Sequence, residues 1–139
     1  SSKEGTTSLG ARYFGLNQEK RQDGLTLNSI EENIMAWIVL VLAGIFEIVW
    51  AYSMKLSDGF SKLTPSLITI FFMVLSFGLL AYAMRTLPLG TAYTIWTGIG
   101  AVGSFLVGIF ILGEPATAMR MLAAVLIVSG LVLMKLSSS

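Results

Sequence analysis

Residues 35–56 read MAWIVLVLAGIFEIVWAYSMKL, an almost uninterrupted apolar run. A helix needs roughly 20 apolar residues to cross about 30 Å of hydrocarbon at 1.5 Å per residue, so this run has the length of one membrane span. Three similar runs follow at about residues 65–84, 89–112 and 116–136, and none alternates as a transmembrane β-strand would. The sequence therefore predicts an all-α membrane protein whose four transmembrane helices form one domain, residues 35–139.

The amino-acid composition agrees with this prediction. Of the 139 residues, 55% are hydrophobic and 12% are charged, whereas a soluble domain carries about 25% charged residues. Nine of the seventeen charged side chains fall in residues 1–34. We expect these residues to form a polar N-terminal extension, mobile or tag-like. The first helix is expected to begin near Ile30, because Ser29 and Glu32 have the spacing of a capping box.

Several classes of protein are excluded by what the sequence lacks. It contains no Cys and no His, so disulfides, thiolate metal sites and the commonest general base are absent. The formal net charge is +1 without a basic cluster, so no nucleic-acid partner is expected. A membrane carboxylate without such groups is not a catalytic set, and we expect no enzyme, no metal and no cofactor.

Glu47 is the one charged residue near the middle of a predicted span. Placing a carboxylate there costs at least about 2.5 kcal/mol on insertion scales, so its side chain must face a protein interior or a wet cavity. This position indicates a site for a proton or a cation. The alternative is a permanently protonated carboxyl that joins two helices, a task that Ser and Thr perform at lower cost.

Neighbouring residues suggest a shell for this site. Gly44 lies one turn before Glu47 on the same helix face, and Trp50 lies one turn after it with an indole N–H that can donate to the carboxylate. Tyr93 and Trp96 form an aromatic pair at i, i+3 spacing in the third run. Trp96 lies too far inside that run for the aromatic belt of the membrane surface.

Two further features are interpreted mainly as packing. Ser76 places a hydroxyl midway along the second run, where a bond to its own helix is the alternative to a role at the site. Gly98, Gly100, Gly103 and Gly108 in the third run permit close helix packing or a hinge.

Two stretches carry a family resemblance: AGIFEIVWA at residues 43–51 and GTAYTIWTGIGA at residues 90–101. The chain from Met35 to Ser139 resembles the small multidrug resistance (SMR) family, and most closely its guanidinium-exporter (Gdx) subtype. Trp50, three residues after the acid, is the discriminating feature, since drug-exporting members usually have a small or hydroxyl residue there.

The resemblance implies a proton-coupled antiporter that exports guanidinium-type cations across the cytoplasmic (inner) membrane, as an antiparallel, dual-topology homodimer. Protons and substrate would compete for the paired Glu47 carboxylates, which suit the planar N–H donors of guanidinium. The resemblance also implies the supporting shell, which comprises Gly44, Trp50, Ser76, Tyr93 and Trp96. In this interpretation Trp50 and Ser76 orient the carboxylates, and Tyr93 and Trp96 wall the pocket.

The charge distribution is compatible with insertion in both orientations. Lys55, Lys62 and Arg120 fall on one side of the membrane, and Arg85 and Lys135 fall on the other. Lys20 and Arg21 are also on that second side, but some fourteen residues before the first span. This is too small a bias to set one orientation. Two other functions remain open, namely a proton-coupled exporter of quaternary ammonium or other hydrophobic cations, and a non-transporting membrane subunit.

Overall fold

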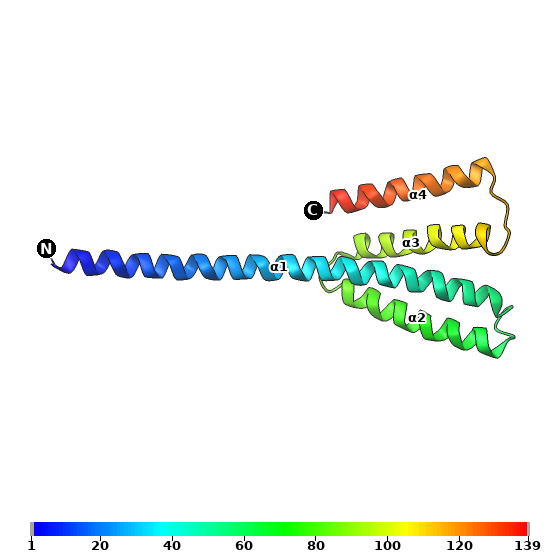
Figure 1. The fold of residues 1–139 in the computed structure, drawn as a ribbon, viewed down its shortest axis with the longest axis horizontal. Coiled ribbons are helices and arrows are strands. Elements are labelled where there is room, and N and C mark those ends of the chain that lie inside the picture. Colours follow the sequence, from blue (N-terminus) through cyan, green and yellow to red (C-terminus); the bar gives the residue numbers. More distant parts are fainter. Residues whose placement is uncertain (1, 139) are drawn as a thin grey trace. The chain divides into compact units, whose positions relative to one another are not determined.

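The computed structural model describes residues 2–138. In that part of the chain all regular secondary structure is helical, and it consists of α1 (Ser2–Leu56), α2 (Leu63–Ala83), α3 (Leu89–Phe110) and α4 (Ala118–Ser137) (Figure 1). All four helices are long and apolar enough to cross a membrane. The predicted all-α architecture with four membrane-spanning helices is therefore confirmed. The chain divides into two compact units, Ser1–Ile34 and Met35–Ser139.

The helix ends in the second unit lie within about two residues of the predicted spans, because prolines and turn residues mark them. Pro65 occupies the first turn of α2, where its missing N–H costs no hydrogen bond. Pro88 is the N-cap of α3. The connections that separate the helices are short, so consecutive helices run antiparallel (Figure 1).

The prediction that the first helix begins near Ile30 is wrong, because α1 begins at Ser2. Ser29 does not cap a helix; its hydroxyl donates to the Leu25 carbonyl at 3.0 Å, a bond inside the continuous helix. Residues 9–35 are exposed except Gly24, which is half-buried. That the extension is mobile stays a prediction.

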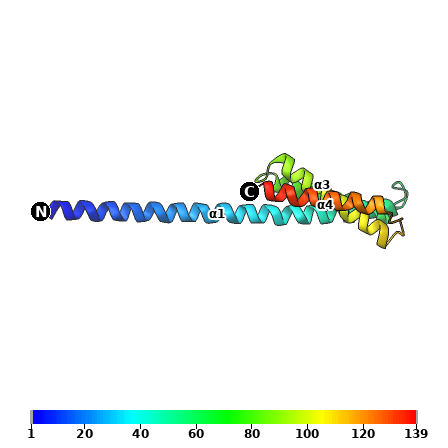
Figure 2. The ribbon, with the colours of Figure 1, turned by 90° about the horizontal axis from the view of Figure 1, so that it is seen from above.

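Within the second unit, the part of α1 after Met35 contacts both α2 and α3. Helices α2 and α3 also contact each other, and α4 packs against α3, which it crosses in the view of Figure 2. Phe46 of α1 and Phe72 of α2 meet edge to face with ring centroids 5.5 Å apart. The buried apolar core comprises Ala36, Leu40, Ala43, Leu80, Ala83, Leu87, Ala92, Ile95 and Trp96. No residue of α4 is buried: Leu131 and Met134 are half-buried against the core, and most of the other residues of this helix are exposed.

Glycines set how closely these helices approach. A Cβ atom at Gly44 would lie 2.8 Å from the Cβ of Ile99, closer than real Cβ contacts. Similarly, a Cβ at Gly103 would overlap with Ile48 of α1, and one at Gly98 would overlap with Leu131 of α4. Gly44 and Gly103 thus lie at the α1–α3 contact, and Gly98 lies at the α3–α4 contact.

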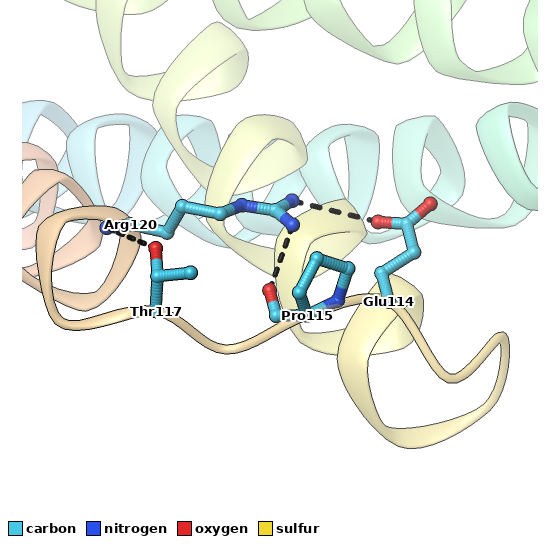
Figure 3. Close-up of polar contacts among 4 residues, drawn as sticks. All are labelled: Glu114, Pro115, Thr117 and Arg120. Carbon is cyan, nitrogen blue, oxygen red and sulfur yellow. Dashed lines mark hydrogen bonds and ion pairs between the residues drawn. The ribbon is translucent and has the colours of Figure 1, made fainter.

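The connection between α3 and α4 is fixed by polar contacts (Figure 3). Thr117 is the N-cap of α4, and its hydroxyl accepts from the Arg120 backbone N–H at 3.2 Å. The Arg120 guanidinium donates to the Pro115 carbonyl at 2.7 Å and lies 3.6 Å from the Glu114 carboxylate. That carboxylate also occupies the space beside Gly108, which therefore packs against the connection rather than against another helix.

Candidate functional site

Glu47 lies on the face of α1 that contacts α3, opposite Gly100. A Cβ atom at position 100 would overlap with the carboxylate of Glu47, so this glycine leaves the space that the carboxylate occupies. Glu47 is half-buried, and its Oε2 atom is buried without a hydrogen-bond partner. Sequence reasoning assigned Gly100 to packing or a hinge, whereas the structure brings it directly to the candidate site.

Trp50 lies one turn after Glu47 on α1 and also has a buried polar atom. Its indole Nε1 is also buried without a hydrogen-bond partner. In the described part of the chain, Glu47 Oε2 and Trp50 Nε1 are the two buried side-chain polar atoms left in this state. An unpaired buried polar group costs about 1–3 kcal/mol, and more if it is charged. Two such atoms at i, i+3 on one helix mark a place where a ligand, a proton or a second chain can supply the missing partners.

Ser76 connects three helices through its hydroxyl. It is fully buried on α2, donates to the Ala43 carbonyl of α1 at 2.7 Å, and accepts from the Trp96 indole N–H of α3 at 2.9 Å. The alternative of a bond to its own helix is therefore not what the structure shows. Because the Ser76 proton is used on Ala43, its expected role in orienting the Glu47 carboxylate stays a prediction.

Aromatic rings line α1, α2 and α3 in a continuous series. Trp50 lies 6.2 Å from Phe77, Phe77 lies 5.6 Å from Trp96, and Trp96 lies 5.6 Å from Tyr93, measured between ring centroids. Trp96 is buried, whereas Tyr93 at the end of the series is exposed. The structure thus brings together the aromatic residues expected from two separate stretches of sequence.

Phe77 is the member of this series that sequence reasoning missed. It follows Ser76 on α2 and joins Trp50 to Trp96. The second run is apolar around its whole circumference, so its sequence does not show which face turns toward α1. The one available signal was its position next to the serine.

The five residues expected around Glu47 fall into two groups in the structure. Trp50, Ser76, Trp96 and Tyr93 are linked by hydrogen bonds or ring contacts. Gly44 is buried against Ile99 and acts on the site through the spacing of α1 and α3. The Glu47 carboxylate accepts hydrogen bonds, and the Trp50 indole N–H donates one. Together they can hold a proton or a cation next to the ring of Trp50, where the aromatic series begins. Among the described residues, no group of three or more His, Cys, Asp or Glu side chains could hold a metal ion.

Four apolar helices with one acid inside the bundle define a small multi-pass membrane protein with an ionisable site in its interior. Residues 35–127 match the family model described as Small Multidrug Resistance protein. The chain belongs to the small multidrug resistance family, and it is a multi-pass membrane transporter. The resemblance expected from the sequence is confirmed.

Three relatives with high sequence identity agree with this assignment. A guanidinium exporter of Salmonella typhimurium (strain LT2) is 57% identical over 104 residues, which cover 75% of this chain and 99% of the relative. Guanidinium exporters of Escherichia coli (strain K12) and Klebsiella oxytoca are 55% identical over the same length and shares. The family match begins at residue 35, so residues 1–34 lie outside it.

Proposed function

We propose that this protein is a proton-coupled antiporter that exports guanidinium-type cations across the inner membrane. Protons and substrate compete for Glu47. The relatives at 55–57% identity are named guanidinium exporters, which supports the substrate class. We extend the activity in the names of these relatives to this chain and add its coupling to protons.

The observation that carries the proposal is the pair of unpartnered polar atoms, Glu47 Oε2 and Trp50 Nε1. A carboxylate in the hydrocarbon region must be neutralised by a proton or by a cation. Guanidinium is planar and presents paired N–H donors along each edge, which a carboxylate accepts with two parallel hydrogen bonds. Its flat face suits the aromatic surfaces of Trp96 and Tyr93.

We infer that the complete site contains two copies of Glu47, one from each chain of an antiparallel homodimer. One chain leaves α4 without a buried residue, which supports a second copy as its cover. The nearly even distribution of Lys and Arg on the two sides supports opposite orientations of the two copies. Two carboxylates can accept from two edges of one guanidinium ion.

The test is uptake by purified protein reconstituted in liposomes with an outward proton gradient. The unmodified chain should accumulate guanidinium, and Glu47→Gln should abolish accumulation because an amide cannot carry the exchanged proton. Glu31→Gln is the matched control: it removes a carboxylate from the extension and should retain uptake. Gradient-driven uptake that survives Glu47→Gln would contradict the proposal.

The same assay separates the two classes of cation. Tetramethylammonium and tetraphenylphosphonium have no N–H donors, so a site built for paired hydrogen bonds should transport neither. Transport of these ions at rates equal to that of guanidinium would instead establish the multidrug alternative.

A further inference from the structure

The extension carries an apolar stripe at heptad spacing that the proposed function does not use. Positions 9, 13, 16, 20, 23, 27, 30 and 34 follow one another at alternating steps of four and three residues, the a and d positions of a coiled coil. Six of these positions are apolar or aromatic: Leu9, Tyr13, Leu16, Leu27, Ile30 and Ile34. The two central positions are Lys20 and Asp23. We call these eight residues the seam.

The seam is exposed along its whole length. Its six apolar side chains have exposed fractions between 50% and 67%. The helix that carries them also contains Gly10, Gly15 and Gly24. Each glycine costs a helix about 1 kcal/mol relative to alanine. Helices in proteins are stabilised mainly by packing of an apolar face, so a helix of this composition requires a partner along the seam.

The order of residues in the seam identifies that partner. In an antiparallel pair of identical helices, each a position faces a d position of the other chain. Centred between residues 21 and 22, such a pair places Leu9 opposite Ile34, Tyr13 opposite Ile30 and Leu16 opposite Leu27. The same register places Lys20 of each chain opposite Asp23 of the other. Every apolar residue therefore meets an apolar one, and each central charge meets its opposite.

We propose that residues 9–34 form an antiparallel two-stranded coiled coil with the same segment of a second copy of this chain. A parallel pair would instead place Lys20 against Lys20 and Asp23 against Asp23, which like-charge repulsion disfavours. In the antiparallel register, the positions that flank the seam place no like charges opposite each other. Gly10 and Gly24 on one flank leave room for close approach of the two helices.

The same residues argue against a membrane surface as the partner. Helices that lie on membranes are rich in Lys and Arg, whereas residues 1–34 contain four basic and five acidic side chains. A membrane-facing stripe would also press Asp23 toward the lipid without a partner. The central Lys–Asp layer is an advantage only when a second seam pairs with it.

This pairing has a consequence for assembly. In the antiparallel dimer proposed above, the two extensions lie on opposite sides of the membrane, so they cannot pair with each other. Because residues 9–34 continue as one helix into the first span, an antiparallel pair has the spans of its two chains at opposite ends. The seam therefore joins chains of different transporter dimers that lie in two facing membranes. The cross-linking test below depends only on the extensions and is independent of transport.

Disulfide cross-linking of the full chain in liposomes tests the register, because the chain contains no Cys of its own. In the double variant Leu16→Cys/Leu27→Cys, thiols of two antiparallel chains face each other, and oxidation should give a covalent dimer. The two thiols of one helix are separated by a rise of about 16 Å, too far for a disulfide within the chain. Each single variant should give little dimer.

The matched control is Phe14→Cys/Leu25→Cys. These residues have the same separation and are similarly exposed, but they lie on the face away from the seam. Dimer yield in the seam variant that is no higher than in this control would overturn the proposal, and this is also the result expected if the extension lies on lipid. Efficient cross-linking of Leu16→Cys alone would show a parallel pair and would overturn it as well.

Charge reversal in the Leu16→Cys/Leu27→Cys background tests the central layer. Lys20→Asp places like charges opposite each other and should lower the dimer yield about tenfold, which corresponds to about 1.4 kcal/mol. Adding Asp23→Lys restores opposite charges and should restore the yield. If the yield does not respond to Lys20→Asp, the proposed register is wrong.

Discussion

The carboxylate of Glu47 occupies space on α3 that exists because residue 100 has no side chain. Glycine at this position does more than bring two helices together, since Gly44 and Gly103 already perform that task against Ile99 and Ile48. Gly100 instead determines where the oxygen atoms of the acid can lie. A single methyl group at this position therefore acts directly on the proposed substrate and proton site.

We expect Gly100→Ala to weaken guanidinium binding about tenfold or more, because the added Cβ overlaps with the Glu47 carboxylate and overpacking costs roughly 1–3 kcal/mol. Gly78→Ala on α2 is the matched control, since a Cβ there meets nothing within 4 Å. It should retain affinity and gain slightly in helix stability. Titration of guanidinium binding to both variants measures the difference. Equal affinities would show that the carboxylate has room elsewhere.

Ser76→Ala should destabilise the protein by about 1–3 kcal/mol, because it leaves the buried Trp96 indole N–H and the Ala43 carbonyl without their shared partner. Ser129→Ala removes a hydroxyl that bonds to the Val125 carbonyl within exposed α4, and it should change stability by less than about 0.5 kcal/mol. Thermal unfolding in detergent compares the two. Similar losses for both variants would mean that the bonds of Ser76 contribute no more than a local one.

At the scale of elements, the turn between α1 and α2 is the most constrained connection. Asp58, Gly59 and Phe60 have φ values of 50°, 70° and 65°, which places three successive residues in the left-handed region. Only glycine adopts this region without a penalty, which for other residues is about 1–2 kcal/mol. Bonds from buried Ser57 maintain the turn: its hydroxyl donates to the Met54 carbonyl at 2.6 Å and accepts from the Phe60 N–H at 3.1 Å.

Phe60→Gly should therefore raise the free energy of unfolding by about 1 kcal/mol, since it relieves the left-handed φ of a side chain that is 49% exposed and contributes little burial. Gly59→Ala, at φ 70°, should lower it by about the same amount. Opposite shifts in melting temperature are the expected result. A loss of stability in Phe60→Gly would mean that the ring packs against lipid or another chain strongly enough to outweigh the strain.

The sequence predicts the ends of some helices better than those of others. The spans are predicted well because the transfer free energy of about 20 apolar residues sums to a large signal, and α2, α3 and α4 accordingly lie within about two residues of expectation. The start of α1 is not predicted, because Gly10, Gly15, Gly24 and a local capping pattern all indicate a later start. Glu47 stands out as a charge in an apolar run, whereas Phe77 depends on the rotation of an evenly apolar helix.

For the whole molecule, the distribution of charge bears on orientation. The α1–α2 turn and the α3–α4 connection lie at one end of the second unit, and the α2–α3 connection lies at the other end with the C-terminus (Figure 1). Lys55, Lys62 and Arg120 belong to the first end, and Arg85 and Lys135 belong to the second. Neither end holds the excess of Lys and Arg that fixes a topology.

Chains with a C-terminal tag should therefore be exposed on both sides of the membrane in comparable amounts. Protease digestion of tags in sealed inside-out and right-side-out vesicles measures the two populations. Adding two Lys residues to the C-terminus should shift the ratio strongly toward a cytoplasmic C-terminus, because the existing bias is so small. Tags found on one side only would contradict the antiparallel homodimer.

The proposed coupling also predicts that transport carries current. The carboxylate pair is neutral when it holds two protons, and it carries a net charge of −1 when it is deprotonated and holds one guanidinium ion. If these are the two states that cross the membrane, export of one cation in exchange for two protons moves one positive charge inward. A potential of 100 mV, negative inside, then adds about 2.3 kcal/mol to the driving force for export.

Protons that occupy the pair exclude the cation, so guanidinium affinity should fall as the pH falls. Proteoliposomes given guanidinium at equal pH on both sides should produce a current that Glu47→Gln abolishes. Guanidinium exchange without current would exclude the two-proton scheme even if Glu47 remained essential for transport.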